Sequence, residues 1–145
     1  MIKMEQSITI NRTQEDVFAF IVSPENETQW QADLVDSRFT SQGDIGMGST
    51  GRDLRRFMGK EIETTWVVTD YQPSHKIGFR VVKGPIPFDA TYIFESVKGG
   101  TKLSFAAWAE TKGVSKLFDP LVNRMGQKQY ERDLAALKAV LEAES

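Results

Sequence analysis

Hydrophobic and polar residues alternate along most of the chain between residues 2 and 109. An alternating run places every second side chain on the same face, which is typical of a half-buried β-strand. The turns between the runs are short, so one antiparallel meander is predicted. Seven strands are expected, at Ile2–Ile10, Leu34–Thr40, Thr50–Met58, Glu61–Asp70, Lys76–Lys83, Phe88–Glu95 and Lys102–Ala109.

Helical spacing is found in the segment after the first strand. Thr13 and Asp16 resemble a capping box, and apolar residues at helical spacing follow them. Ser23-Pro24 ends this short helix and begins a second one, which runs to Trp30. We expect Trp30 to anchor this helix pair on the sheet.

The stretch from Gly113 to Glu144 predicts the one long helix of the chain, because strong helix formers dominate its second half. Two apolar stripes on it lie about 140° apart around the helix axis. Two interpretations stay open. Either the helix bends near Pro120 or Gly126, or it is straight and its early stripe faces loops or a ligand. The early stripe is Leu117, Leu121 and Met125, and the late one is Tyr130, Leu134, Leu137 and Leu141.

The widths of the predicted elements point to a cavity. Seven strands make a sheet about 30 Å wide, whereas one helix with its side chains is about 10 to 12 Å across. The sheet must therefore curl around the helix, and we expect an internal cavity between them. The predicted class is α+β, with a seven-stranded curved antiparallel sheet wrapped around a long C-terminal helix and two short helices after the first strand. The expected lining is Thr64, Trp66, Phe79, Tyr92, Phe94, Phe105, Val122 and Met125.

Composition narrows the classes of function. The 145 residues suit a single domain over 1–145, and 40% of them are hydrophobic. A net charge of −2 argues against a nucleic-acid-binding protein. The absence of cysteine and the single histidine argue against a metal site. No apolar run has the length of a signal peptide or a bilayer span, so we expect a cytoplasmic protein without stable membrane insertion.

Several short motifs recur in an order that resembles a known superfamily. They are Val17-Phe18-Ala19-Phe20-Ile21 followed by Pro24 and Trp30, Gly46-Met47-Gly48, Val68 to Pro73, Tyr92 to Glu95, Gly99 to Leu103, and the pattern from Asp133 to Glu142. In this order the chain resembles the START/Bet v 1-like (SRPBCC) helix-grip superfamily. Within it, the chain is similar to small bacterial proteins described as polyketide cyclase/dehydrase or lipid-transport domains. The resemblance covers nearly the whole chain and implies a cavity for lipids, polyketides, sterols or hormones, with cyclisation or dehydration in some members.

Other candidate chemistry is weaker. The G-x-G-x-x-G match at 46–51 precedes a strand and not a helix, so we interpret it as a loop at the cavity mouth. His75 lies in a turn and is expected at the surface. Arg52 and Arg56 would bind a ligand carboxylate or an enolate-like oxygen if their strand turns them inward. Gln6, Thr64 and Tyr92 are inward positions that would orient a polar ligand end.

The leading hypothesis is a monomer or homodimer that binds a small hydrophobic molecule without a cofactor or metal. The alternative is a polyketide cyclase/dehydrase-like enzyme acting in the same cavity on an aromatic or polyketide substrate. Its catalytic residues are unknown, with Tyr92, Tyr130 and Asp133 as candidates for acid–base work. A third hypothesis is a protein-interaction adaptor that uses Leu117, Leu121 and Met125.

Overall fold

The computed structural model describes residues 1–84 and 87–143, and within them one antiparallel sheet contains seven strands. The strands lie in the order β1-β7-β6-β5-β4-β3-β2, so every strand except β1 pairs with its neighbour in the chain. β1 instead pairs with β7, from Ile2 opposite Ala109 to Ile10 opposite Thr101. The strands are β1 (Ile2–Ile10), β2 (Leu34–Phe39), β3 (Thr50–Phe57), β4 (Lys60–Gln72), β5 (Lys76–Lys83), β6 (Phe88–Val97) and β7 (Gly100–Ala109).

The predicted meander is confirmed, and each strand end lies within two residues of its predicted position. The alternation is also confirmed, because residues predicted to point inward are mostly buried while their neighbours are exposed. The predicted break at Gly84–Pro87 includes residues 85 and 86, which lie outside the described residues.

The two short helices follow β1 as predicted. α1 (Gln14–Ile21) begins at Thr13, whose hydroxyl accepts a hydrogen bond from the Asp16 backbone N–H at 3.1 Å. The second element, η1 (Pro24–Gln29), is a 3-10 helix that ends at Trp30. Trp30 is buried in the core, which is where an anchor for the helix pair must lie.

The C-terminal run forms two elements. A 3-10 helix, η2 (Gly113–Phe118), leads into the α-helix α2 (Asp119–Ala143). The helix type changes at Asp119, next to Pro120, which suits the first turn of a helix because proline lacks a backbone N–H. α2 continues without a break through Gly126.

Gly126 allows helix and sheet to approach closely. A Cβ added at this glycine would collide with the Met4 side chain on β1. The apolar pattern changes at this point because α2 passes over β1 here, and the early stripe points away from the sheet into solvent.

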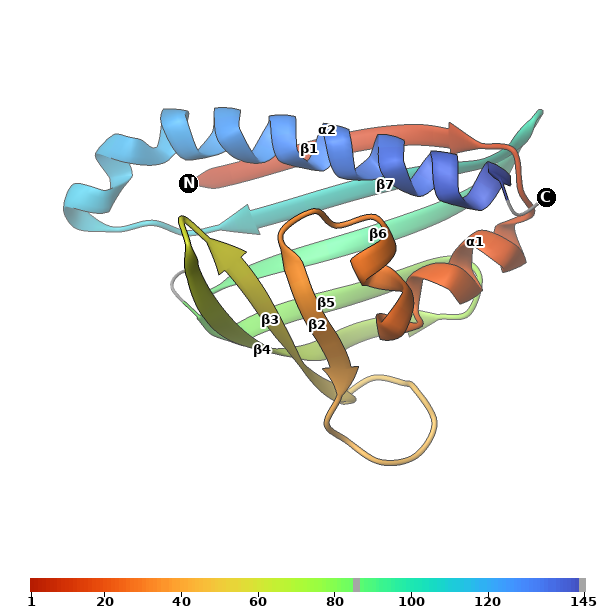
Figure 1. The fold of residues 1–145 in the computed structure, drawn as a ribbon, viewed down its shortest axis with the longest axis horizontal. Coiled ribbons are helices and arrows are strands. Elements are labelled where there is room, and N and C mark those ends of the chain that lie inside the picture. Colours follow the sequence, from red (N-terminus) through yellow and green to blue (C-terminus); the bar gives the residue numbers. More distant parts are fainter. Residues whose placement is uncertain (85–86, 144–145) are drawn as a thin grey trace.

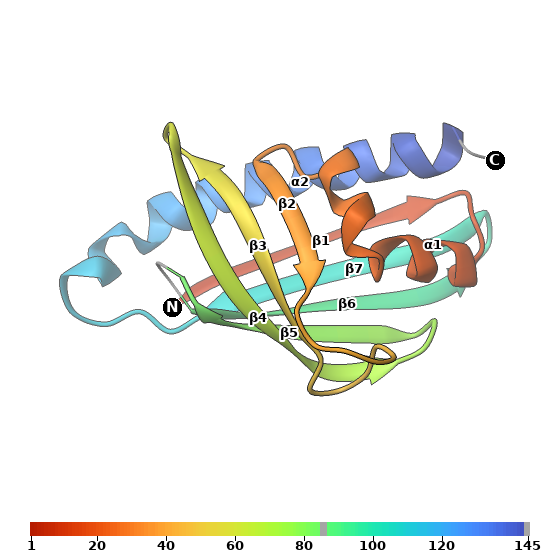
Figure 2. The same cartoon turned by 60° about the horizontal axis from the view of Figure 1, so that its bottom comes forward.

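The sheet curls strongly, as Figures 1 and 2 show, with α2 running along β1 at one edge and β2 to β4 bending away. The second half of α2 packs into the concave side, where Leu134, Leu137 and Leu141 are buried. α1 contacts β6 and β7 at the same end of the molecule as the C-terminal end of α2 (Figure 1). This is the helix-grip arrangement expected from the sequence.

Candidate functional site

A row of aromatic rings crosses the concave face of the sheet. Each ring contacts the next, with centroid separations of 5.3, 5.2, 6.4, 4.9 and 4.3 Å from one end to the other. Most of these contacts are edge-to-face or tilted, which is the geometry that aromatic quadrupoles favour. The row consists of Phe39 on β2, Trp66 on β4, Phe79 on β5, Tyr92 on β6, Phe105 on β7 and Tyr130 on α2.

Strand alternation explains why these rings meet. Tyr92 lies opposite Phe105 in the β6–β7 register, so both rings stand on the same face. Gly51 on β3 lies opposite Trp66, and a Cβ added at Gly51 would collide with the indole ring. The third glycine of the G-x-G-x-x-G match is therefore explained by the packing of Trp66 against β3, and not by a phosphate.

The concave face is open to solvent in part. Phe39, Phe79 and Tyr130 point inward yet are only half-buried. Trp66 and Phe105, which lie between them in the row, are buried. Water therefore reaches the row at separate places.

A network of polar side chains lies at the Trp66 end of the row, with the Asp53 carboxylate at its centre. Asp53 Oδ1 accepts hydrogen bonds from Ser37 Oγ at 2.6 Å and from Trp66 Nε1 at 2.9 Å. Asp53 Oδ2 accepts from the Arg55 guanidinium at 2.9 Å, and Arg55 also donates to Asp33 Oδ1 at 3.3 Å. Because Asp53 and Ser37 are buried, this network needs all of its partners to remain favourable.

The structure shows which arginines of β3 point toward the concave side of the sheet. Asp53 and Arg55 share the inward face of β3 with Gly51. Arg52 and Arg56 point outward and pair with Glu63 at 3.3 Å and Glu61 at 3.7 Å. Arg55, which the sequence did not single out, is therefore the arginine on the concave side.

Glu27 on η1 lies near this network, and Glu27, Asp53 and Arg55 together form the polar flank of the concave face. Burial, together with the neighbouring charge of Asp53, raises the pKa of Glu27 from 4.5 to about 8. Burial alone would lower the pKa of Arg55, but the charges of Asp53 and Asp33 outweigh it, and the pKa of Arg55 is raised. At neutral pH the flank therefore contains a protonated carboxylic acid beside a fixed cation.

The two tyrosines of the row respond to the same charges. Burial, followed by the charge of Glu27, raises the pKa of Tyr92 well above 10. Burial also raises the pKa of Tyr130, although Arg55 opposes it. Both phenols therefore stay protonated at physiological pH and are able to donate hydrogen bonds.

Asp133 is buried on the face of α2 that meets η1 and β2. It accepts a hydrogen bond from the Ala32 backbone N–H at 3.4 Å, and burial raises its pKa above 3.8. The sequence left open whether this carboxylate is solvated, and the structure shows that it joins α2 to the loop before β2.

Four of the predicted lining residues, Trp66, Phe79, Tyr92 and Phe105, come together in the aromatic row. Phe94 lies farther along β6, where it packs against Phe18 with ring centroids 5.1 Å apart. Thr64 is half-buried on β4, on the same face as Trp66.

Val122 and Met125 on α2 do not pack against the core. Val122 is half-buried and lies about 20° around the helix axis from Asp133, about three turns earlier on α2. Met125 is 54% exposed and faces farther from the sheet.

Two other candidates have structural partners. The amide of Gln6 donates to Gln127 of α2 at 3.3 Å, so it fastens the helix to β1. His75 is exposed in the turn before β5, as expected, with Nδ1 3.1 Å from the Gln14 amide nitrogen.

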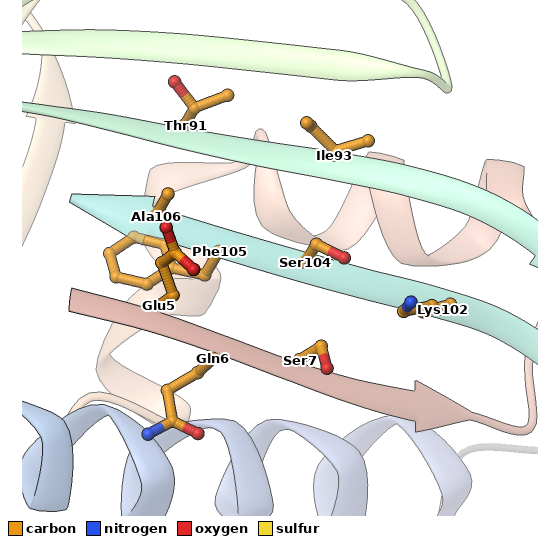
Figure 3. A pocket seen from close by; sticks show the side chains of 9 residues that line it. All are labelled: Glu5, Gln6, Ser7, Thr91, Ile93, Lys102, Ser104, Phe105 and Ala106. Carbon is orange, nitrogen blue, oxygen red and sulfur yellow. The ribbon is translucent and has the colours of Figure 1, made fainter.

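Two hollows lie on the surface of the molecule, and Phe105 of the aromatic row is among the residues that line the first of them. One, of about 480 Å³, follows the outer face of β1, β7 and β6, where Ser7, Ser104 and Thr91 are exposed between longer side chains (Figure 3). The other, of about 650 Å³, lies at the turn between β1 and α1. The enclosed cavity expected from the sequence stays a prediction.

The described ranges 1–84 and 87–143 contain neither a metal-binding cluster nor a membrane-spanning helix. No group of three or more His, Cys, Asp or Glu residues there is arranged to hold a metal ion. No helix in those ranges is both long and apolar enough to cross a membrane.

Comparison with known proteins identifies the family. A family model described as "Polyketide cyclase / dehydrase and lipid transport" matches residues 1–142. The chain belongs to this family. No curated protein matches the chain.

Solved structures extend the likeness of this polyketide cyclase/dehydrase and lipid transport family member to the fold. TTHA0849 from Thermus thermophilus is similar, with a TM-score of 0.82, 17% identity and 99% of each chain covered. The Zhui aromatase/cyclase from a Streptomyces species, R1128, has a TM-score of 0.78 at 13% identity, covering 97% of this chain and 93% of its own. Ara h 8.0201 has a TM-score of 0.75 at 16% identity, with 97% of each chain covered. At these identities the likenesses show a shared fold, which is the helix-grip fold expected from the sequence.

Sequence reasoning missed the polar flank formed by Glu27, Asp53 and Arg55. A signal was present, because Gly51, Asp53 and Arg55 alternate along one face of a strand opposite Trp66. Charges on the other face of the same strand concealed this signal. Glu27 gave no such signal in the sequence, since it lies in a short polar 3-10 helix.

Proposed function

We propose that this protein binds a small, largely apolar molecule against the aromatic row, with an anionic or carbonyl end directed at Arg55. Lipids and aromatic or polyketide-like molecules fit this description. The observation that carries the proposal is the contact between the row and the polar network at Trp66, whose ring packs in the row while its N–H binds Asp53.

The chemistry of Arg55 supports the polar end of this ligand. A guanidinium has five N–H donors in a planar fork, and the two carboxylate contacts described above use only part of them. The Arg55 side chain is 29% exposed, so a ligand oxygen can reach it. Charge-assisted hydrogen bonds of this kind are about twice as strong as neutral ones.

The aromatic row supports the apolar end. Phe79 and Tyr130 offer half-exposed ring surface on both sides of the buried rings. Covering this surface would remove apolar area from water at about 25 cal/mol per Å². The proposal keeps seven of the eight lining residues predicted from the sequence as ligand contacts and adds Arg55, whereas Met125 points away from the sheet and is not retained.

Binding of cis-parinaric acid and its methyl ester, followed by their fluorescence, tests the proposal. The wild-type protein is expected to bind both and to prefer the acid. Arg55→Lys keeps the charge but loses the fork, so the preference for the acid should fall about tenfold, the effect of one charge-assisted hydrogen bond. Phe79→Ala should weaken the binding of acid and ester equally.

Arg56→Lys is the matched control, because Arg56 is the next residue on the same strand and points outward. It should leave the preference unchanged. If neither probe binds the wild-type protein, or if the two lysine variants behave alike, the proposed ligand mode is wrong.

A second candidate function is catalysis in the same place, and Glu27 is the observation that favours it. With a pKa of about 8, this carboxylic acid is protonated at neutral pH and lies among Arg55, Tyr92 and Tyr130. An acid beside a cation suits a cyclase or dehydratase, which must protonate an oxygen or stabilise an enolate.

Turnover of a polyketide-like β-polyketone separates the two functions. For an enzyme, Glu27→Gln should abolish product formation while cis-parinaric acid still binds, and the rate of the wild type should fall as the pH rises past about 8. Unchanged turnover by Glu27→Gln would exclude Glu27 as the acid. The cytoplasmic location expected from the sequence stays a prediction, and so does the choice between a monomer and a homodimer.

A further inference from the structure

The ligand proposal gives no role to an apolar patch on η2 and the first turns of α2. Five large apolar side chains on η2 and the first two turns of α2 are exposed and lie outside the apolar core. In an ordinary surface helix such residues would face the core. The patch consists of Val114, Leu117, Phe118, Leu121 and Met125, which are 74%, 78%, 56%, 53% and 54% exposed.

Basic side chains surround this apolar patch. Lys128 and Arg132 each lie within about 20° of Leu121 around the helix axis, on the side facing away from the sheet. Lys116 and Arg124 border the same turns, and all four are exposed. Lys116, Arg124 and Lys128 form no ion pair with any residue in the described part of the chain.

Acidic side chains do not balance these cations. Asp119 is buried and already binds the N-terminal amine at 2.8 Å and the Thr111 hydroxyl at 2.7 Å. Glu131 is the other carboxylate between residues 116 and 132. The segment is therefore basic in a chain whose net charge is −2.

We propose that the apolar patch docks this protein on a membrane surface that carries anionic lipids. A helix that lies in the membrane interface typically has exposed apolar side chains, such as leucine, phenylalanine and methionine, beside lysine and arginine. The apolar side chains would enter the boundary between head groups and acyl chains. The flanking cations would meet phosphate and carboxylate groups of the lipids.

The same charges disfavour a second copy of this chain as the occupant. A two-fold dimer places the same patch on both sides of its interface, so the cations of the two copies would be brought together. An anionic lipid surface instead satisfies the apolar and the basic side chains at once. η2 and the patch lie at the opposite end of the molecule from the β6–β7 turn (Figures 1 and 2), which provides distant control positions.

Co-sedimentation with lipid vesicles tests this docking surface. The wild-type protein should sediment with vesicles of equimolar phosphatidylcholine and phosphatidylserine, and not with phosphatidylcholine alone. Binding should weaken as salt is added, because exposed charges are screened.

Charge reversal tests the basic residues. Lys116→Glu/Lys128→Glu should weaken binding to the phosphatidylserine vesicles about 25-fold or more, at roughly fivefold for each cation lost. Lys98→Glu/Lys102→Glu is the matched control, because it changes the net charge equally at the β6–β7 turn. We expect the control to stay within about threefold of the wild type.

Apolar substitution tests the patch itself. Leu117→Gln/Leu121→Gln should weaken vesicle binding at least about tenfold. Val82→Gln/Val97→Gln replaces two exposed apolar residues elsewhere and should change nothing. All of these side chains are exposed, so circular dichroism and melting temperature should match the wild type in each variant.

Three results would overturn the docking proposal. One is the absence of binding to the phosphatidylserine vesicles. Another is an equal loss of binding in the target and control variants. The third is a dimer in sedimentation equilibrium that Leu121→Gln dissociates, which would assign the patch to a second copy. The target variants leave Arg55 and the aromatic row unchanged, so the loss of vesicle binding that they measure is separate from the outcome of the parinaric acid assay.

Discussion

The two flanks of the concave face differ in how they are held together. On β5, β6 and β7, the rings of Phe79, Tyr92 and Phe105 touch one another, and their stability comes from buried apolar area and ring contacts. On β2 and β3, Asp53 and its donors are held by a hydrogen-bond network. An apolar flank loses stability gradually as atoms are removed, whereas a buried polar network fails when one member is lost. A single substitution in the polar flank should therefore lower the free energy of unfolding more than one in the apolar flank.

The largest effect is expected from Asp53→Ala. This substitution leaves the Ser37 hydroxyl, the Trp66 N–H and one side of Arg55 without their acceptor, and it should lower the free energy of unfolding by about 3–5 kcal/mol. Urea denaturation measures the loss. Asp36→Ala is the control, because Asp36 is exposed on β2, and it should stay within about 0.5 kcal/mol of the wild type. Equal losses in the two variants would mean that the network does not stabilise the fold.

A smaller effect is expected from Phe105→Leu on the apolar flank. The leucine stays apolar but loses the ring contacts with Tyr92 and Tyr130, at centroid separations of 4.9 and 4.3 Å. The free energy of unfolding should fall by about 1–3 kcal/mol, from two ring pairs. Phe88→Leu is the control, since Phe88 is half-buried and makes no ring contact within the described residues. A loss larger than that of Asp53→Ala would reverse the ranking of the two flanks.

The smallest effect, when counted per pH unit, is a pH dependence caused by Glu27. Its pKa is about 8 in the folded chain and near 4.5 when exposed, so between these values the folded chain keeps a proton that the unfolded chain has lost. This contribution to stability is complete below pH 4.5 and is lost as the pH rises towards 8. The slope should be at most about 1.4 kcal/mol per pH unit.

Glu27→Gln should remove this slope, because glutamine does not titrate. Glu25→Gln, two residues away and exposed on the same 3-10 helix, should keep it. Urea unfolding at pH values across the window measures both variants. A wild-type stability that rises between pH 5 and 8 would contradict the assigned environment of Glu27.

Most of the fold could be predicted from the sequence, because its signals are local. Alternation along β6 and β7 fixed which side chains share a face, and Tyr92 and Phe105 lie opposite each other as a meander requires. The capping box at Thr13 is likewise a local signal that needs no partner from elsewhere in the chain.

The polar flank could not be predicted in this way. On β3 both faces contain charged residues, so alternation does not say whether Asp53 and Arg55 or Arg52 and Arg56 point inward. The choice depends on Trp66 of the neighbouring strand, whose ring needs Gly51 opposite it and whose N–H needs a buried acceptor.

The sequence by itself determined the strands, the inward faces of the strands other than β3, the short helices and the run of residues that forms α2, because periodicity and capping act over a few residues. Tertiary structure alone decided which charges of β3 are buried, how far α2 covers the sheet, and the raised pKa of Glu27. These properties depend on burial and on charges brought together from η1, β2, β3 and α2, and no local pattern contains that information.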